Sequence, residues 1–188
     1  DSNDDSDNGD NGDSGDNGDQ PPAQDNTRYR LTAPATVGQF KRVGTPETTN
    51  IPDRDRRTYR ITYGNQISTQ YSTTGRPAPG AGDKAVSFAG GWGTLTDPEH
   101  TVDTLMQELS ERSPWHLGTA VEQNPQGAEN LRMKCAQGTS ASVCIWAEPS
   151  TFGIVALLHG PSDAPRGAPV AETAQVTVEF ARAMRQPL

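Results

Sequence analysis

Residues 131–147 decide the fold: Leu131-Arg-Met-Lys-Cys-Ala-Gln-Gly-Thr-Ser-Ala-Ser-Val-Cys-Ile-Trp-Ala147. The segment between Cys135 and Cys144 is rich in small residues and contains Gly138, which is typical of a turn. Two extended flanks joined by such a turn bring the two cysteine side chains close enough to bond. We therefore expect a disulfide hairpin, with a buried pair of reduced thiols as the alternative.

The residues after this hairpin form the most apolar run of the chain. Residues 151–159 read Thr-Phe-Gly-Ile-Val-Ala-Leu-Leu-His, which predicts a buried strand. Trp146 lies two residues after Cys144, so on a strand both side chains share one face, and we expect the indole to cover the disulfide. The sequence predicts no metal site, because the cysteine pair has neither a second pair nor a nearby histidine.

Two helices are predicted. Asp97 is a natural N-cap for a helix over 98–112, with Pro98 at its first position and apolar residues on one stripe. A last helix is predicted from about Ala168 to Arg185. The alternation of Val176, Val178 and Phe180 makes a strand the alternative there.

Further strands are expected on the N-terminal side of the first helix. The alternation of Tyr59, Ile61 and Tyr63 predicts a strand over 57–63, which 66–74 could continue. A strand over 84–89 is followed by Gly-Gly-Trp-Gly, which we interpret as a tight turn at 90–93. Shorter strands are expected at 28–31 or 37–43, and near 119–123.

This order of elements predicts an α+β fold. We expect an antiparallel β-sheet with two main helices packed on one of its faces, and one disulfide hairpin. Residues 28–188 are predicted to form a single globular α+β domain, which is long enough to bury a core.

Residues 1–27 have a different composition. Residues 1–20 hold eight Asp and no Lys or Arg, so the whole net charge of −8 belongs to this segment. We predict a disordered acidic Asp/Asn/Gly-rich linker. The spacing of its residues does not fit a calcium loop of the EF-hand type, which leaves a cation-responsive tail as an alternative function. The remaining residues are formally neutral and show no basic stripe, so no nucleic-acid partner is expected.

Cellular location is indicated by the predicted disulfide, because such bonds persist in oxidising compartments. The chain begins at Asp1 and contains no signal peptide and no run of about 18 apolar residues. We therefore expect an extracytoplasmic protein that is either secreted or anchored to the outer face of the membrane. The signal peptide or membrane anchor that this requires is expected to have been cut from the N-terminal side of Asp1.

Residues 144–153, Cys-Ile-Trp-Ala-Glu-Pro-Ser-Thr-Phe-Gly, together with the upstream Cys135, resemble a recurring pattern. It is found in actinobacterial membrane-anchored or secreted proteins of unknown function, and the resemblance covers about residues 84–185. The resemblance implies an extracytoplasmic domain that contains a disulfide and follows a linker. It implies no activity, because these proteins have no known function. More distantly, the order of elements is similar to that of PsbP/Mog1-like domains, which is an analogy of fold alone.

No motif specifies catalysis or a cofactor, so the sequence predicts no catalytic residue and no cofactor. Trp115 and His116 follow the first helix and are the candidate binding surface. The leading hypothesis is a membrane-tethered binding module of the cell envelope, with an envelope protein, a peptide or a small ligand as its partner. A hydrolase or transferase acting on cell-wall material is the alternative, with roles for some of His116, Glu148 and His159.

Reduction of the disulfide should destabilise the protein. A closed loop of about 10 residues limits the unfolded chain and contributes roughly 2–3 kcal/mol. We expect a thiol reductant to lower the melting temperature, measured by circular dichroism with and without the reductant. An unchanged melting temperature would argue that the bond is absent.

Overall fold

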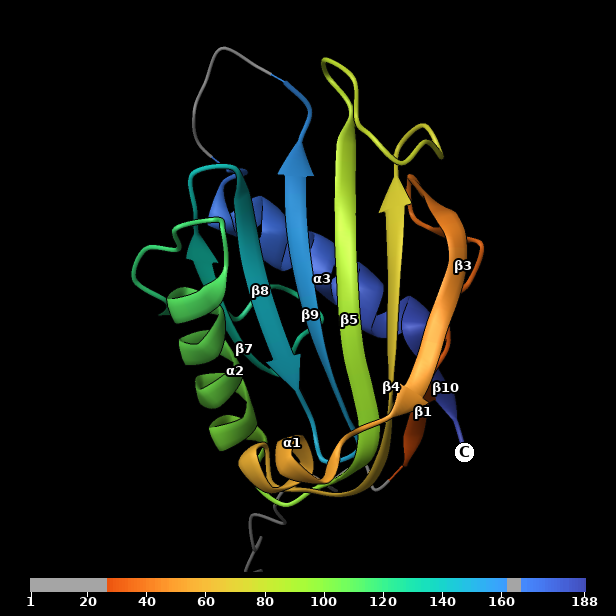
Figure 1. The fold of residues 1–188 in the computed structure, drawn as a ribbon, viewed down its shortest axis with the longest axis vertical. Coiled ribbons are helices and arrows are strands. Elements are labelled where there is room, and N and C mark those ends of the chain that lie inside the picture. The colour runs from red at the N-terminus through yellow and green to blue at the C-terminus, as the bar shows by residue number, and fades with distance from the viewer. Residues whose placement is uncertain (1–26, 162–166) are drawn as a thin grey trace, which may run out of the picture.

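The computed structural model describes residues 27–161 and 167–188 (Figure 1). Within these residues the chain forms an eight-stranded sheet, a separate two-stranded pair and three helices. The elements are β1 (Tyr29–Leu31), β2 (Thr36–Val37), β3 (Phe40–Asn50), α1 (Asp53–Thr58), β4 (Ile61–Ser72), β5 (Lys84–Leu95), α2 (Pro98–Arg112), β6 (Val121–Glu122), β7 (Arg132–Gln137), β8 (Ala141–Ala147), β9 (Thr151–His159), α3 (Val170–Met184) and β10 (Arg185–Pro187).

The strands of the large sheet run in the order β2-β3-β4-β5-β9-β8-β7-β6, and β1 pairs with β10. Every pair of neighbouring strands is antiparallel. The predicted α+β class, an antiparallel sheet with two main helices and one disulfide hairpin, is confirmed.

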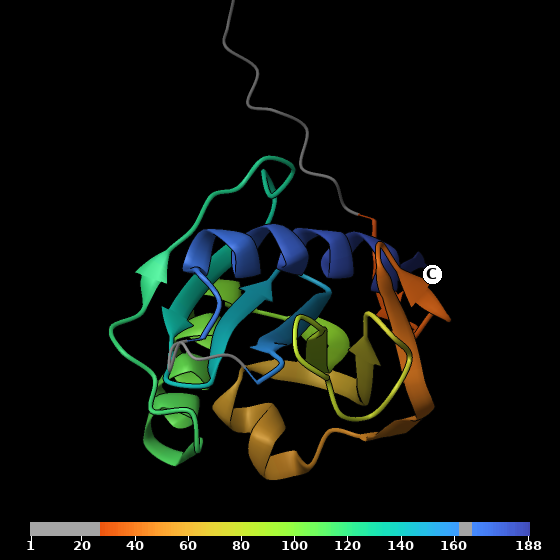
Figure 2. The same cartoon turned by 90° about the horizontal axis from the view of Figure 1, so that it is seen from above.

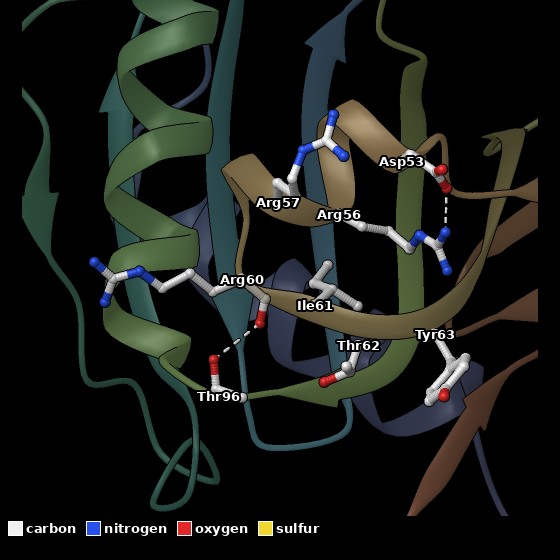
Figure 3. A pocket seen from close by; sticks show the side chains of 8 residues that line it. All are labelled: Asp53, Arg56, Arg57, Arg60, Ile61, Thr62, Tyr63 and Thr96. Atoms are coloured by element: carbon white, nitrogen blue, oxygen red, sulfur yellow. Dashed lines mark hydrogen bonds and ion pairs between the residues drawn. The ribbon is translucent and has the colours of Figure 1, made fainter.

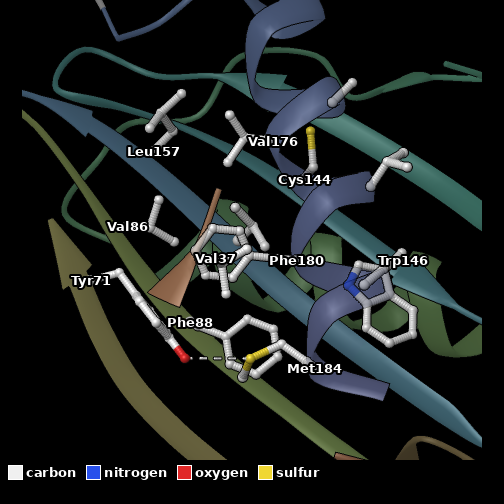
Figure 4. Close-up of a cluster of buried hydrophobic side chains, with 14 of the residues drawn as sticks. Val37, Tyr71, Val86, Phe88, Cys144, Trp146, Leu157, Val176, Phe180 and Met184 are labelled. Carbon is white, nitrogen blue, oxygen red and sulfur yellow. Dashed lines mark hydrogen bonds between the residues drawn. The ribbon is translucent and has the colours of Figure 1, made fainter. Parts of the chain in front are cut away.

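The helices cover both faces of the sheet, because β8 is buried along its whole length. Cys144 and Trp146 pack into the core on the side of α3 (Figure 4). Val143, Ile145 and Ala147 pack into the second core, on the side of α2. Figure 2 shows α3 along one face and α1 on the opposite face. Our expectation that both main helices pack on one face is therefore wrong, since a strand with two apolar faces needs cover on each.

Both predicted helices are present: α2 has the predicted boundaries, whereas α3 begins two residues later than predicted and ends one residue earlier, because Arg185 begins β10. In α2, the Asp97 side chain accepts a hydrogen bond from the His100 N–H over 3.0 Å, which caps the helix. In α3, Ala174, Val178 and Ala181 are buried against the sheet. The strand alternative for this segment is wrong, because its apolar residues follow a helical repeat and α3 covers the disulfide side of the sheet.

The disulfide joins Cys135 and Cys144, which lie directly opposite each other on β7 and β8, with their Cα atoms 4.1 Å apart. Both residues are fully buried, and Trp146 is buried in the same cluster. Among the described residues, neither cysteine remains as a free thiol. The predicted pairing is confirmed and the alternative of reduced thiols is wrong.

Two local predictions are wrong. The segment predicted as a strand over 57–63 begins as the end of α1, and β4 starts only at Ile61. The predicted turn at 90–93 is part of β5, which continues to Leu95. A Cβ atom on Gly91 would lie 2.5 Å from the ring of Phe152, so glycine there makes room for a side chain of the neighbouring strand.

The acidic linker predicted over 1–27 lies outside the described residues except for Thr27, and so does the cation-responsive tail. In the part of the chain that the structure describes, no helix is both long and apolar enough to cross a membrane.

Adding a methyl group at Gly153 should destabilise the fold. Gly153 lies opposite Trp146 on the neighbouring strand, and a Cβ atom there would lie 2.6 Å from the indole Nε1. We expect Gly153→Ala to lower the free energy of unfolding by about 1–3 kcal/mol, because a packed core tolerates added volume poorly. The measurement is chemical denaturation monitored by tryptophan fluorescence.

Gly118→Ala is the matched control, because the nearest atom to a Cβ there, the Gln137 oxygen, is 3.4 Å away. Equal stability of the two variants would contradict the packing of Trp146 on Gly153.

Candidate functional site

The main hollow of functional interest lies at the end of the sheet where β8 turns into β9. It has a volume of about 820 Å³. We call it the end cleft, and it is lined by residues 27–29, 94, 96–99, 129–132, 147–150 and 185. These residues come from segments far apart in the sequence, and they lie side by side only in the folded protein.

Backbone hydrogen bonds fix the β8–β9 turn at the base of the end cleft. The Leu95 N–H donates to the Pro149 carbonyl over 2.9 Å, which joins the turn to the end of β5. The Tyr29 N–H donates to Ser150 Oγ over 3.1 Å, which joins the same turn to β1. The turn therefore has little freedom to move, and it presents its side chains at defined positions.

The base of the end cleft holds a buried ion pair. Arg185 Nη1 lies 2.6 Å from Glu148 Oε2, and the two side chains are 18% and 7% exposed. Thr151 donates its hydroxyl hydrogen bond to the other carboxylate oxygen of Glu148 over 2.5 Å. Arg185 also donates from Nε to the Ala181 carbonyl over 2.9 Å and lies over the ring of Tyr29. The pair is neutral overall, and both charges are satisfied within the protein.

The walls of the end cleft carry both signs of charge. Arg28 donates a hydrogen bond to Thr94, whereas Arg132 is exposed and makes no ion pair with another described residue. The His100 N–H, and then the nearby Arg60, hold the pKa of Asp97 below its usual value.

Glu129 also lines the end cleft. Hydrogen bonds from backbone N–H groups, its own and that of Gly127, lower the pKa of its carboxyl group. This carboxylate and that of Asp97 are therefore ionised at neutral pH. The end cleft thus offers cationic donors and anionic acceptors to a ligand.

The predicted binding surface lies elsewhere. The Trp115 side chain is half-buried against the core on the α2 side, and its carbonyl accepts a hydrogen bond from the Thr139 N–H over 2.8 Å. His116 is exposed, with a φ of 47°. Neither residue lines the end cleft, and their role as a contact surface stays a prediction.

The residues of the alternative catalytic hypothesis are not brought together. Glu148 lies just before β9, whereas His159 ends that strand, so the length of β9 separates them. His159 Nε2 lies 3.6 Å from Glu172, which also pairs with Lys84. His100, which is not part of that hypothesis, has its Nε2 3.1 Å from the Thr58 carbonyl and belongs to the contact between α2 and α1.

Sequence reasoning noticed Glu148 but missed its partner Arg185 and the wall residues Arg28 and Arg132. No local sequence signal marks these arginines, because they are far apart in the sequence and lie together only in the folded chain. Over residues 27–161 and 167–188, no group of three or more His, Cys, Asp or Glu side chains is arranged to hold a metal ion.

Comparison of the chain with protein-family models, curated proteins and solved structures finds no match. The resemblance to actinobacterial envelope proteins and the analogy to PsbP/Mog1-like domains stay predictions.

Breaking the buried pair should destabilise the protein. Arg185→Gln leaves the Glu148 carboxylate buried without its charged partner, which we expect to lower the free energy of unfolding by about 2–4 kcal/mol. The double variant Glu148→Gln with Arg185→Gln removes both charges and should recover a large part of this loss. Urea denaturation at pH 7 measures both.

Lys134→Gln is the control, since it breaks the more exposed pair with Asp103 and should lower stability by about 1 kcal/mol or less. If Arg185→Gln were no more harmful than Lys134→Gln, the pair would not hold the base of the cleft.

Proposed function

We propose that this protein is an extracytoplasmic binding module of the cell envelope that holds a polar ligand in the end cleft. The observation that carries the proposal is the cleft itself, about 820 Å³ in volume and assembled from five segments of the chain. This volume falls within the range of small-molecule sites in proteins. A peptide segment of an envelope protein, a short free peptide or a small oligosaccharide fits such a space.

The arrangement of charges favours binding over catalysis. Glu148 is the deeply buried carboxylate of the end cleft, and both of its oxygens are engaged, one by Thr151 and the other by Arg185. A carboxylate engaged at both oxygens by neighbouring side chains is held in place at the base of the end cleft, and we assign it the role of joining the β8–β9 turn to Arg185. The neutral, rigid base and the charged walls instead suit a ligand that carries both donors and acceptors.

The disulfide fits an oxidising, extracytoplasmic setting. We extend this to a module that is tethered to the outer face of the membrane through the acidic N-terminal segment. The composition of residues 1–20 and the resemblance to actinobacterial membrane-anchored proteins support this extension. The first described residue, Thr27, lines the end cleft, so a tether would join the domain at its binding end.

The proposal predicts that a charge reversal in the end cleft removes binding. The probe is a soluble digest of bacterial peptidoglycan, which contains short peptides and oligosaccharides. Its binding to the full chain is measured by saturation-transfer NMR. We expect Arg132→Glu to weaken binding about tenfold or more, because a charge-assisted hydrogen bond becomes a repulsion. A ligand signal that Arg132→Glu leaves unchanged would contradict the end cleft as the site.

Arg112→Glu is the matched control, since Arg112 ends α2 and does not line the end cleft. The same samples are followed over time for chemical change. Fragments that are altered in proportion to protein concentration would contradict a binding module and favour the hydrolase or transferase alternative.

A further inference from the structure

A second hollow adjoins the end cleft and differs from it in charge. It has a volume of about 560 Å³, and Thr96 lines both hollows. We call it the arginine depression, and it is lined by residues 53, 56, 57, 60–63 and 96 (Figure 3). Three of its side chains are arginines and one is a carboxylate, so its lining is basic, whereas the walls of the end cleft carry both signs.

An exposed tyrosine forms one rim of the arginine depression. The register between β4 and β5 shifts between Thr62 and Gly64, which places Tyr63 as the unpaired residue of a β-bulge. Tyr63 has a φ of 51°, in the left-handed region that tyrosine rarely adopts, and it is 80% exposed. The absence of a side chain at Gly93 allows its backbone to lie against the Tyr63 carbonyl. Conformations of this kind persist where the surrounding structure enforces them, and they gather at functional sites.

The arginines are held in different ways. Arg56 forms an ion pair with Asp53, which fixes its guanidinium on the same side of the depression as Tyr63 (Figure 3). Arg60 reaches away to Asp97, with 2.5 Å between Nη1 and Oδ2. Arg57 is exposed, and its side chain makes no ion pair with any other residue that the structure describes. The charge of Arg57 is thus available to a ligand. Its guanidinium points away from Arg56 and Tyr63 in Figure 3, so the exposed Arg57 side chain has to turn toward them to contact a ligand there, whereas Arg56 already lies on that side.

We propose that the arginine depression binds an anionic ligand in which a phosphate or carboxylate group is joined to a ring. Guanidinium groups bind such anions through paired, charge-assisted hydrogen bonds, which Arg56 and Arg57 supply. The exposed face of Tyr63 accepts the ring by stacking. This site is separate from the one proposed for the end cleft, and neither depends on the other.

Phenyl phosphate and inorganic phosphate are the probes. Each is titrated at millimolar concentration into the full chain, and the amide resonances of residues 53–63 are followed by NMR. We expect Arg57→Gln to weaken phenyl phosphate binding about tenfold. Tyr63→Ala should weaken phenyl phosphate binding about threefold or more and leave inorganic phosphate unaffected, because only the former carries a ring.

Arg54→Gln is the matched control, since Arg54 lies on the same short helix and does not line the arginine depression. The proposal is overturned if phenyl phosphate shifts none of these resonances. It is also overturned if Arg54→Gln weakens binding as much as Arg57→Gln, or if Tyr63→Ala leaves phenyl phosphate binding unchanged. Arg132→Glu, the variant of the end cleft, should leave phenyl phosphate binding intact, so the two proposals can fail separately.

Discussion

The complete burial of β8 is the constraint on which the rest of the structure depends. All seven of its residues are buried, and alternate side chains enter the two cores. A strand of this kind requires apolar cover on both faces, which α3 and α2 supply. The disulfide then lies inside the α3 side, where Cys144 bonds to Cys135 on the neighbouring strand and Trp146 fills the adjacent space. The positions of both helices thus follow from one short strand.

The same strand positions the candidate sites. The turn that follows β8 carries Glu148, and its backbone is joined to β5 and to β1. The ion pair with Arg185 connects this turn to the end of α3. These bonds join four of the segments that line the end cleft, namely the β8–β9 turn, β5, β1 and the end of α3, and limit their movement relative to one another. The arginine depression uses the same end of the sheet but draws on α1 and on the β-bulge at Tyr63.

The elements with strong local signals could be predicted from the sequence. Asp97 and Pro98 marked the start of α2, and the turn between two extended flanks predicted the disulfide. The sequence could not show that the two main helices lie on opposite faces of the sheet, because the face that each helix covers depends on which strands are neighbours. Gly91 looked like part of a turn, since sequence shows the missing side chain but not the Phe152 ring that occupies its space. The end cleft was missed for the same reason: Arg28, Arg132 and Arg185 are distant in sequence.

The pairing of β1 with β10 has a mechanical consequence. Tyr29 lies opposite Pro187 and Leu31 opposite Arg185, so the outermost residues of both strands are partners. Tension applied through the two ends of this pair would load its hydrogen bonds one after another, as in a zipper, and not all together. The last partner to separate would be Arg185, which holds Glu148. The load would therefore reach the base of the end cleft only after the outer rungs of this pair had separated.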